Sequence, residues 1–434
     1  MKLFILNILL LELTIQKFLV INLKKDNYNS NKFKNNNYLK NEEIMEILLY
    51  NNYFTLINVG KPKKEIKFFI SFNKSQTILT NSEFSKSRSI FYKYNNTTKE
   101  SLDIFEFIDN KNYKIDNYHF NLLEISQKNE MSQIPSILGL KPTEKNSINN
   151  NILYQLQNNG LINKRIFSYI NVENSENYYK KEILLLGELP EVCNFNIKIN
   201  NFPKDEIKWT KIDSKIYNDS QKWNIKIDSF YTNYNQTSIN NTFIEFDLDH
   251  NLIIAPEIFR IYLLDNFMYV LIDKDICKED YFYNERNKKH YIFYLCNNIE
   301  DFNYKMIYFK NNDLNETFEI CLGDIFYRHN KKLFFGIIFD GDIKEGNNIN
   351  IWKFGKIFLE KYTIVFDDEN KRIGYYKILK EKDNPFIIII SFIVFFCCIV
   401  LFAFIGFILR KKEKIKDDNK INKNCGKDEK EKKD

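Results

Sequence analysis

A repeated pattern of short strands and polar turns constrains the fold of this chain most strongly, and it is clearest in residues 352–375. There Gly355 opens a turn, a short amphipathic segment follows, and residues 362–366 alternate in polarity as a half-buried strand does. The polar residues 367–370 are typical of a tight reversal before a second strand. Similar strand-length segments, separated by polar turns, begin near residue 50. The sequence therefore predicts a mostly β chain.

Length and charge set the broad class of the protein. With 434 residues the chain can bury a large core or two fused lobes. Its formal net charge of +6 is small for that length and spread along the chain, so no nucleic-acid partner is expected. Asn, Lys, Ile and Tyr are over-used, as an AT-rich genome would produce. Triplets of the form Asn-x-Ser/Thr, such as those at Asn95, Asn235 and Asn315, are therefore expected by chance.

The amino-terminal region has features of a secretory signal. Lys2 precedes the apolar run Leu3–Leu11, as in the first two regions of a signal peptide. We therefore assign residues 1–22 to a signal peptide. Glu12 interrupts the pattern and no small-residue cleavage site is evident, which leaves a retained signal anchor as the alternative. Residues 23–46 are rich in Asn and Lys with little periodicity, and we predict a linker or a short pro-segment there.

The carboxy-terminal region predicts a membrane anchor. The uninterrupted apolar run at residues 386–409 is long enough to cross a bilayer as one helix. Basic residues follow it directly and place the charged tail, residues 410–434, in the cytoplasm. We therefore expect a single-pass type I membrane protein whose ectodomain is lumenal or extracellular.

Four cysteines in the predicted ectodomain, Cys193, Cys277, Cys296 and Cys321, agree with an oxidising compartment. Cys277 and Cys296 flank a short, polar, hairpin-like stretch, which favours a disulfide between them. A bond between Cys193 and Cys321 then follows by elimination, although four cysteines allow three pairings. No CxxC pair or histidine cluster indicates a metal site, and neither a metal nor a cofactor is expected.

Several segments, taken in order, resemble those of pepsin-like aspartic peptidases. They are Tyr53–Pro62, Ser136–Leu140, Asn151–Ser168, Leu184–Glu188, Trp209–Asp228 and Trp352–Tyr375. The region between Cys277 and Cys296 is most similar to the membrane-anchored branch with plasmepsin-type and memapsin-type enzymes. The resemblance covers residues 50–378 and implies a bilobal, mostly β fold, with an amino-terminal lobe at 47–190 and a carboxy-terminal lobe at 191–380.

The catalytic loops of that family are altered in this chain. In the family, two carboxylates share one proton and activate a water between them, each carboxylate on an Asp-Thr/Ser-Gly loop. The first loop aligns with residues 71–73, Ser-Phe-Asn, and a serine cannot be half of a carboxylate pair. The second aligns with residues 247–249, Asp-Leu-Asp, which lack the hydroxyl and the glycine. The resemblance thus leaves Asp247 as the one candidate catalytic residue, opposite Ser71, with a structural role in capping its loop as the alternative.

Three further residues are site candidates. Asp249 could substitute for the missing carboxylate, although it lies two residues beyond Asp247 and is expected on the other side of the strand. Tyr113 is a candidate flap tyrosine that binds ligand, with a plain surface tyrosine as the alternative, because residues 101–108 lack the family's flap pattern. His250 could act as a base or be an ordinary turn histidine.

These features favour an inactive pseudopeptidase of the secretory pathway or cell surface, which holds a peptide or protein ligand in an interlobe cleft without cutting it. A divergent, active aspartic endopeptidase that uses Asp247 is the first alternative. A structural surface protein or adhesin is the second, because a fold does not fix a function.

Overall fold

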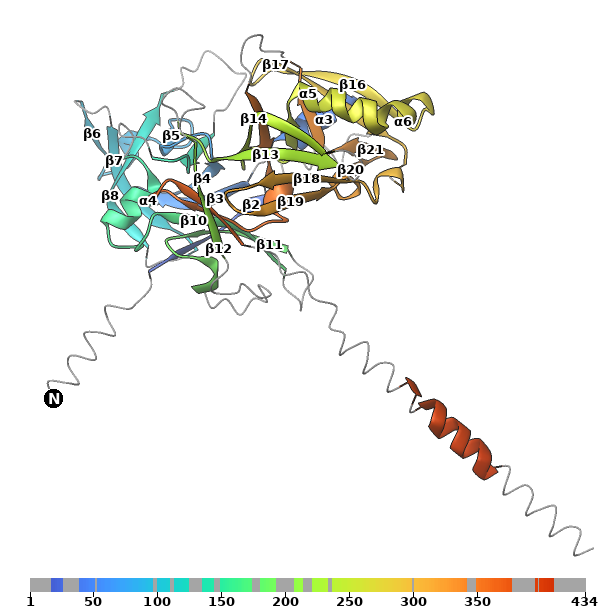
Figure 1. Ribbon diagram of the computed structural model, residues 1–434. Coiled ribbons are helices and arrows are strands. Elements are labelled where there is room, and N and C mark those ends of the chain that lie inside the picture. The colour runs from blue at the N-terminus through green and yellow to red at the C-terminus, as the bar shows by residue number, and fades with distance from the viewer. Residues whose placement is uncertain are drawn as a thin grey trace, which may run out of the picture. The chain divides into compact units, whose positions relative to one another are not determined.

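The computed structural model describes most of the chain between residues 17 and 409, and this part is mostly β, as the sequence predicts. The described residues are 17–25, 39–50, 53–96, 100–109, 113–124, 135–143, 149–173, 180–192, 207–213, 221–232, 236–298, 300–341, 349–376, 395–396 and 398–409. The chain divides into two compact units, Met1–Lys377 and Ile378–Asp434. All the sheets and the candidate site belong to the first unit (Figure 1).

One sheet is built from strands of both halves of the chain. Its order is β1 (Leu19–Asn22), β11 (Lys180–Leu186), β10 (Ile166–Glu173), β24 (Ile364–Asp367), β25 (Arg372–Tyr376) and β12 (Ile207–Lys211). Strands β10 and β24 pair antiparallel with Phe167 opposite Phe366, so this six-stranded sheet joins the two halves. Strands β24 and β25 confirm the predicted strand, turn and strand, and the Asp367 carboxylate accepts a hydrogen bond from the backbone N–H of Asn370 at 3.1 Å.

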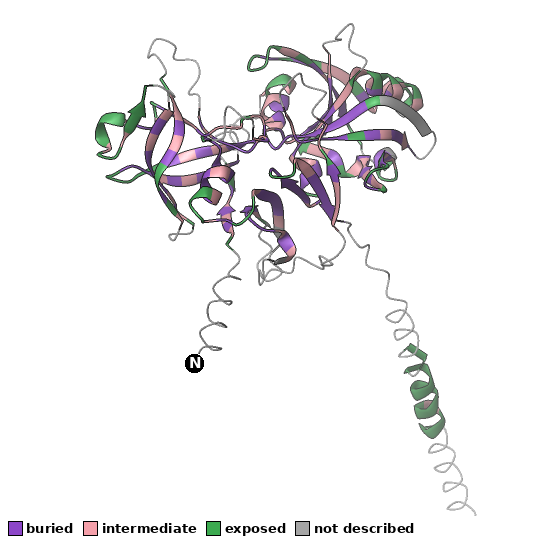
Figure 2. Ribbon diagram, turned by 60° about the vertical axis from the view of Figure 1, so that its left-hand side comes forward, coloured by how far each residue is buried: buried purple, intermediate pink, exposed green. Residues whose placement is uncertain are grey.

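A second sheet comes from the first half of the chain. Its order is β2 (Lys24–Lys25), β3 (Tyr53–Val59), β4 (Lys64–Ser71), β9 (Ser136–Gly139), β5 (Ile78–Thr80), β8 (Lys114–Leu123), β7 (Glu100–Phe107) and β6 (Lys93–Asn95). Buried and partly buried residues alternate along β3, the period of a strand with one face on a core (Figure 2). Strand β4 is parallel to β9, with Ser71 opposite Gly139, so β4 ends inside the sheet.

The third sheet has eleven described strands and comes from the second half. Ten of them run in the order β19 (Glu316–Cys321), β18 (Met306–Asn311), β13 (Asn224–Thr232), β14 (Gln236–Phe246), β23 (Asn350–Phe354), β15 (Ile253–Ala255), β22 (Ile337–Asp340), β17 (Lys289–Cys296), β21 (Lys332–Phe335) and β20 (Phe326–His329). Strand β16 (Cys277–Asn284) pairs with β17 outside this order. Strand β14 runs parallel to β23 and ends at Phe246, directly before the Asp-Leu-Asp sequence.

Short helices cover parts of the sheets. They are α3 (Asn41–Leu49), α4 (Ile152–Asn158), α5 (Glu257–Leu263), a π-helical turn (Leu264–Met268), α6 (Tyr269–Asp273) and α7 (Lys356–Leu359). Single 3₁₀ turns occupy Lys86–Arg88, Pro190–Val192, Glu300–Phe302 and Leu322–Ile325. Helix α4 begins where the Asn151 side chain accepts the N–H groups of Leu153 and Tyr154, and it ends before Gly160, whose φ of 65° suits glycine.

The amino-terminal segment contributes a strand that the sequence did not predict. Residues 1–16 of the predicted signal peptide lie outside the described residues, but Leu19–Asn22 form β1 and pair with β11. Leu19 and Ile21 are buried, so cleavage after residue 22 would remove an integral strand. The period-two alternation at 19–23 was hidden within an apolar amino-terminal region.

The predicted linker, residues 23–46, is also structured where it is described. Helix α3 packs Ile44, Met45 and Leu49 into a hydrophobic cluster that also contains Leu252 and Phe293 from the third sheet. The spacing of these three residues is helical, but the Asn- and Lys-rich composition around them concealed it.

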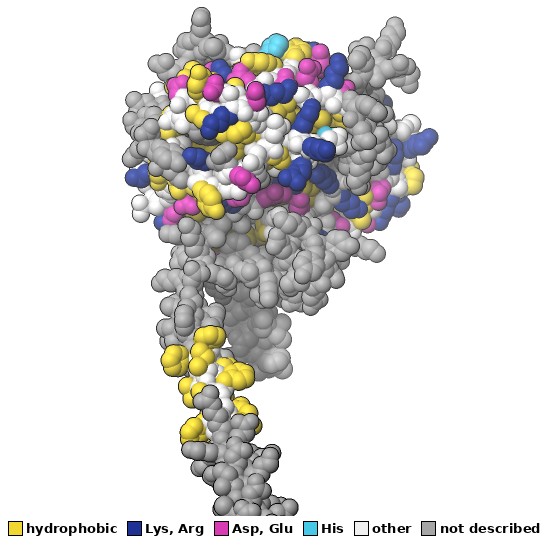
Figure 3. Space-filling view, turned by 90° about the vertical axis from the view of Figure 1, so that its right-hand side faces the viewer, with side chains coloured by type: hydrophobic (Ala, Val, Ile, Leu, Met, Phe, Trp, Pro, Cys, Tyr) yellow, Lys and Arg dark blue, Asp and Glu magenta, His cyan; other side chains and the backbone are white. Residues whose placement is uncertain are grey.

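The second unit contains the predicted anchor. Residues 395–396 and 398–409 are helical and expose their hydrophobic side chains, whereas 386–394, 397 and the tail 410–434 lie outside the described residues (Figure 3). Within the described part of the chain, we find no helix that is both long enough and apolar enough to cross a membrane. On the face of the first unit shown in Figure 3, basic and acidic side chains are interspersed with hydrophobic ones.

Candidate functional site

Two loops from opposite halves of the first unit meet at the ends of β4 and β14. We call residues 71–73 the first loop and residues 247–250 the second loop. The backbone of each is fixed by a neighbouring strand: the Ser71 carbonyl accepts the Leu140 N–H at 2.8 Å, and the Asp247 N–H donates to the Phe354 carbonyl at 3.0 Å. The resemblance described above predicted both loops, and the structure brings them together.

Each of the two loops contains an internal hydrogen bond of the same type. In the first loop the Asn73 N–H donates to Ser71 Oγ at 3.2 Å. In the second loop the Asp249 N–H donates to Asp247 Oδ1 at 3.0 Å. In each case the third residue holds the side chain of the first. Ser71 and Asp247 therefore occupy equivalent positions, and the first position has no ionisable group.

Asp249 connects the second loop to the first. Its carboxylate accepts hydrogen bonds from Ser71 Oγ and from the Phe72 N–H, both at 2.7 Å. The prediction that Asp249 lies on the other side of the strand from Asp247 is wrong, because residues two apart in a strand share a face, and here the chain also turns at residues 248–249. Both carboxylates of the second loop therefore face the first loop.

A single amide lies against both carboxylates. Asn73 Nδ2 is 3.0 and 2.9 Å from the two oxygens of Asp247 and 3.3 Å from Asp249 Oδ2. The amide has two hydrogens, so it is fully used by these acceptors. Sequence reasoning treated Asn73 only as a replaced glycine and missed this role; its polar side chain beside an aspartate pair was the available signal.

His250 holds Asp247 from the other side. Its Nδ1 lies 2.9 Å from Asp247 Oδ2, and its ring stacks on Tyr50 with ring centres 5.7 Å apart. His250 is 7% exposed and Asp247 is fully buried. The histidine is thus a partner of the carboxylate, a buried arrangement that neither of the two sequence interpretations anticipated.

The surroundings of Asp247 and Asp249 shift the pKa values of their carboxyl groups in opposite directions. Burial raises the pKa of Asp247, but His250, the Lys353 ammonium and the Asn73 amide outweigh burial and hold that pKa below its usual value. Burial and then the charge of Asp247 raise the pKa of Asp249 to about 6, against the hydrogen bonds from the first loop. Asp247 is therefore ionised at neutral pH, and Asp249 gains a proton in mildly acidic solution.

Apolar side chains stand where the resemblance implies bracing hydroxyls. Phe72 is buried and packs edge-on against Phe167 and Phe366, with ring centres 5.4 and 5.1 Å apart. Leu248, at the equivalent position of the second loop, is also buried. The loops are thus held against the six-stranded sheet by packing.

Tyr113, the predicted flap residue, is not part of this cluster. Its hydroxyl donates to the backbone carbonyl of Phe18, and burial raises its pKa. Tyr113 therefore holds the segment that leads into β1, and its assignment to ligand binding has no support from its contacts.

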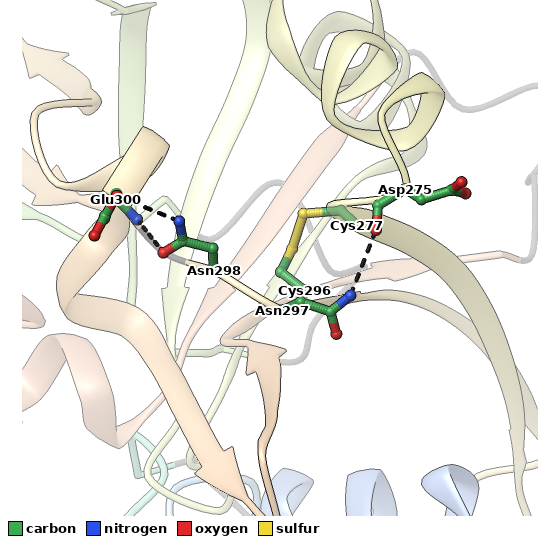
Figure 4. The surroundings of a disulfide bond; sticks show 6 residues. All are labelled: Asp275, Cys277, Cys296, Asn297, Asn298 and Glu300. Carbon is green, nitrogen blue, oxygen red and sulfur yellow. Dashed lines mark hydrogen bonds between the residues drawn. A yellow bond between two sulfur atoms is a disulfide. The ribbon is translucent and has the colours of Figure 1, made fainter.

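The cysteines follow the prediction in part. Cys277 and Cys296 face each other across the β16–β17 ladder and form a disulfide (Figure 4). Beside it, Asn297 Nδ2 donates to the Asp275 carbonyl at 3.4 Å. Cys321 instead has a free thiol, which donates to the Asn303 carbonyl at 3.4 Å, and Cys193 lies outside the described residues. The bond between Cys193 and Cys321 therefore stays a prediction.

Among the described residues, no group of three or more His, Cys, Asp or Glu side chains is arranged to hold a metal ion. The cluster at the two loops is instead closed by hydrogen bonds between its own members. Comparisons of the sequence with protein-family models and with curated proteins find no match for this chain.

Proposed function

We propose that residues 47–380 form a two-lobed domain of the pepsin type that has lost catalysis and binds a peptide or protein segment. One observation supports this best: Ser71 stands opposite Asp247, and the hydrogen bonds of both are satisfied within the cluster. Aspartic peptidase chemistry needs two carboxylates that share a proton and hold a water. Here Asp247 is bound by Asn73 and His250 instead.

The same proposal places the domain in the lumen of the secretory pathway or outside the cell, anchored by residues 386–409. The disulfide between Cys277 and Cys296 supports an oxidising compartment. The six-stranded sheet that joins both halves supports a two-lobed arrangement. An extended ligand between the lobes would be held by strand-like backbone hydrogen bonds, which do not require the catalytic loops to be intact.

One observation favours a divergent endopeptidase as a second candidate. Asp247 and Asp249 have pKa values shifted in opposite directions, which is the pattern of paired carboxylates that act as base and acid. In that case Asp249, protonated below about pH 6, would be the acid and Asp247 the base. The His250 contact opposes this, because it occupies an oxygen of Asp247 that would need to reach a water.

The two candidates differ in one experiment. Full-length protein in detergent micelles is incubated with a random nonapeptide library carrying a photocrosslinker, at several values between about pH 4 and pH 7, where carboxylate pairs work. We expect crosslinked peptide and no pepstatin-sensitive cleavage by mass spectrometry. Cleavage that is abolished by both Asp247→Asn and Asp249→Asn would establish the endopeptidase. If the protein neither crosslinks to a peptide nor cleaves one, both candidates are rejected.

A further inference from the structure

In two Asn-x-Ser/Thr triplets the structure describes both the asparagine and the hydroxyl side chain. One of these asparagines is enclosed by carboxylates and the other is exposed. Asn73-Lys74-Ser75 lies in the first loop, and Asn315-Glu316-Thr317 lies at the turn between β18 and β19. Chance explains why such triplets occur in an Asn-rich chain, but it does not decide which of them can be modified in the folded protein. The surroundings of each asparagine amide decide that.

The Asn73 amide cannot carry a substituent. Its Nδ2 lies 2.9–3.3 Å from three carboxylate oxygens of Asp247 and Asp249, and both of its hydrogens are used there. A sugar on Nδ2 would replace one hydrogen and would have to fit between two loops whose neighbouring residues, Ser71 and Phe72, are buried. The folded chain therefore excludes a glycan at Asn73.

The Asn315 side chain has the opposite setting. It is exposed, and no hydrogen bond to it is found among the described residues. Its backbone has a φ of 50°, a left-handed conformation that asparagine tolerates, and its N–H donates to the Asn312 carbonyl at 3.0 Å. The turn itself is fixed, because Leu314 is buried and its N–H donates to the Asn311 side chain at 2.6 Å.

The hydroxyl member of the triplet is also at an edge. Thr317 is the second residue of β19, which is the terminal strand in the order of its sheet, and it pairs with Lys310 on one side only. Asn312 and Asp313 beside it are exposed and polar, so a bulky hydrophilic group meets no apolar surface there. The turn therefore presents both chemical elements of an acceptor site at the surface of a rigid hairpin.

We propose that Asn315 carries an N-linked glycan. The proposal rests on the lumenal placement given under Proposed function. In the transfer, Nδ2 of Asn315 forms a bond to the anomeric carbon of a polyprenyl-pyrophosphate-linked oligosaccharide. The bond from that carbon to the pyrophosphate oxygen breaks, the lipid pyrophosphate leaves with the bonding electron pair, and the amide releases one proton. Such glycans are bulky, solubilising and confined to surfaces.

The test expresses the full chain in eukaryotic cells and measures its gel mobility before and after an amide-cleaving endoglycosidase. We expect one glycan fewer on Asn315→Gln and on Thr317→Ala than on the parent protein. Thr317→Ser, which keeps the hydroxyl, retains the glycan. Parent protein that shows the same number of glycans as both loss variants would overturn the proposal.

A reporter site separates this inference from the proposed topology. Lys332→Thr creates a new triplet at Asn330, which is exposed in the turn between β20 and β21. If Lys332→Thr gains a glycan while Asn315 carries none, the domain is lumenal and the inference about Asn315 fails alone. If neither Asn330 nor Asn315 is modified, both the lumenal placement and the inference about Asn315 fail. A mobility shift that disappears in Asn73→Gln would contradict the argument from amide hydrogen bonds.

Discussion

The first and second loops have equivalent backbones and opposite side-chain chemistry. Both end a buried strand, and in both the third residue donates its N–H to the side chain of the first. The first loop supplies neutral donors, Ser71 and Asn73, whereas the second supplies two carboxylates and His250. A symmetric site would have one carboxylate on each loop. This one has both on the same loop, and the other loop provides their hydrogen bonds.

That difference explains how two buried carboxylates on one loop can be stable. Buried carboxylates are costly unless paired and hydrogen-bonded. The first loop supplies no acid, but it supplies an amide that lies within hydrogen-bond distance of both Asp247 and Asp249. The same hydrogen bonds connect the two halves of the unit, so the two loops form a junction between them. The following predictions test that contrast.

The largest expected effect comes from the packing beneath the first loop. Phe72→Ala should lower the free energy of unfolding by about 4 kcal/mol, because it leaves a cavity against Phe167 and Phe366. Phe72→Thr introduces the hydroxyl that the resemblance implies. It should cost about as much, because the apolar Leu248 side chain cannot form a hydrogen bond with that hydroxyl. Denaturant unfolding of the detergent-solubilised protein measures both. Phe91→Ala, at a 41% exposed ring, is the control. A stable Phe72→Thr would show that hydroxyl bracing is still accommodated.

The next effect concerns the partner of Asp247. His250→Ala should cost about 3 kcal/mol, because it leaves a buried carboxylate oxygen without its hydrogen-bond partner. His250→Gln should cost less, since an amide can still donate a hydrogen bond. The exposed His290 provides the control, and His290→Ala should change stability by less than about 0.5 kcal/mol. Equal stability of the two alanine variants would mean that Asn73 alone suffices for Asp247.

The sequence predicted the positions of this site better than its interactions. The loops at Ser71 and Asp247 were located by the resemblance to the family's motifs, and the structure brings these two loops together. The contacts of Asn73 with Asp247 join residues 174 positions apart, and no local pattern encodes such a pairing. The error over Asp249 was one of strand geometry, since residues two apart in a strand point to the same face. Strand β1 was not predicted, since the apolar composition of the amino-terminal region concealed the alternation at 19–23.

A pH-dependent effect isolates Asp249. Its pKa is raised in the folded state to about 6, above the ordinary value of 3.8, so between these values the folded chain binds more protons than the unfolded chain. Stability from this group is therefore present in acid and lost as the pH rises through about 6. Relative to Asp249→Asn, the wild type should lose about 2 kcal/mol between about pH 4.5 and pH 7.5.

Thermal and denaturant unfolding at matched pH values measure that difference. Asp247 does not contribute to it, because its lowered pKa keeps it ionised throughout this window. The exposed Asp324 serves for comparison, and Asp324→Asn should follow the wild type at every pH. A wild type that instead gains stability relative to Asp249→Asn as the pH rises would mean that the hydrogen bonds from Ser71 and Phe72 outweigh the repulsion by Asp247.

The smallest expected effect is on catalysis, where Ser71→Asp should restore no peptidase activity. The new carboxylate would face Asp249, which now accepts the Ser71 hydroxyl, so at neutral pH it adds repulsion to the junction. Asp247 would still be bound by Asn73 and His250, and no water would be placed between two carboxylates that share a proton. Digestion of the nonapeptide library at about pH 4 to 7 measures the activity. Asp249→Gly combined with Ser71→Asp removes the repulsion but keeps the Asn73 amide, and we expect it to be inactive as well. Pepstatin-sensitive cleavage by Ser71→Asp alone, lost again with Asp247→Asn, would show that the loops still form a working site and differ only by the missing acid.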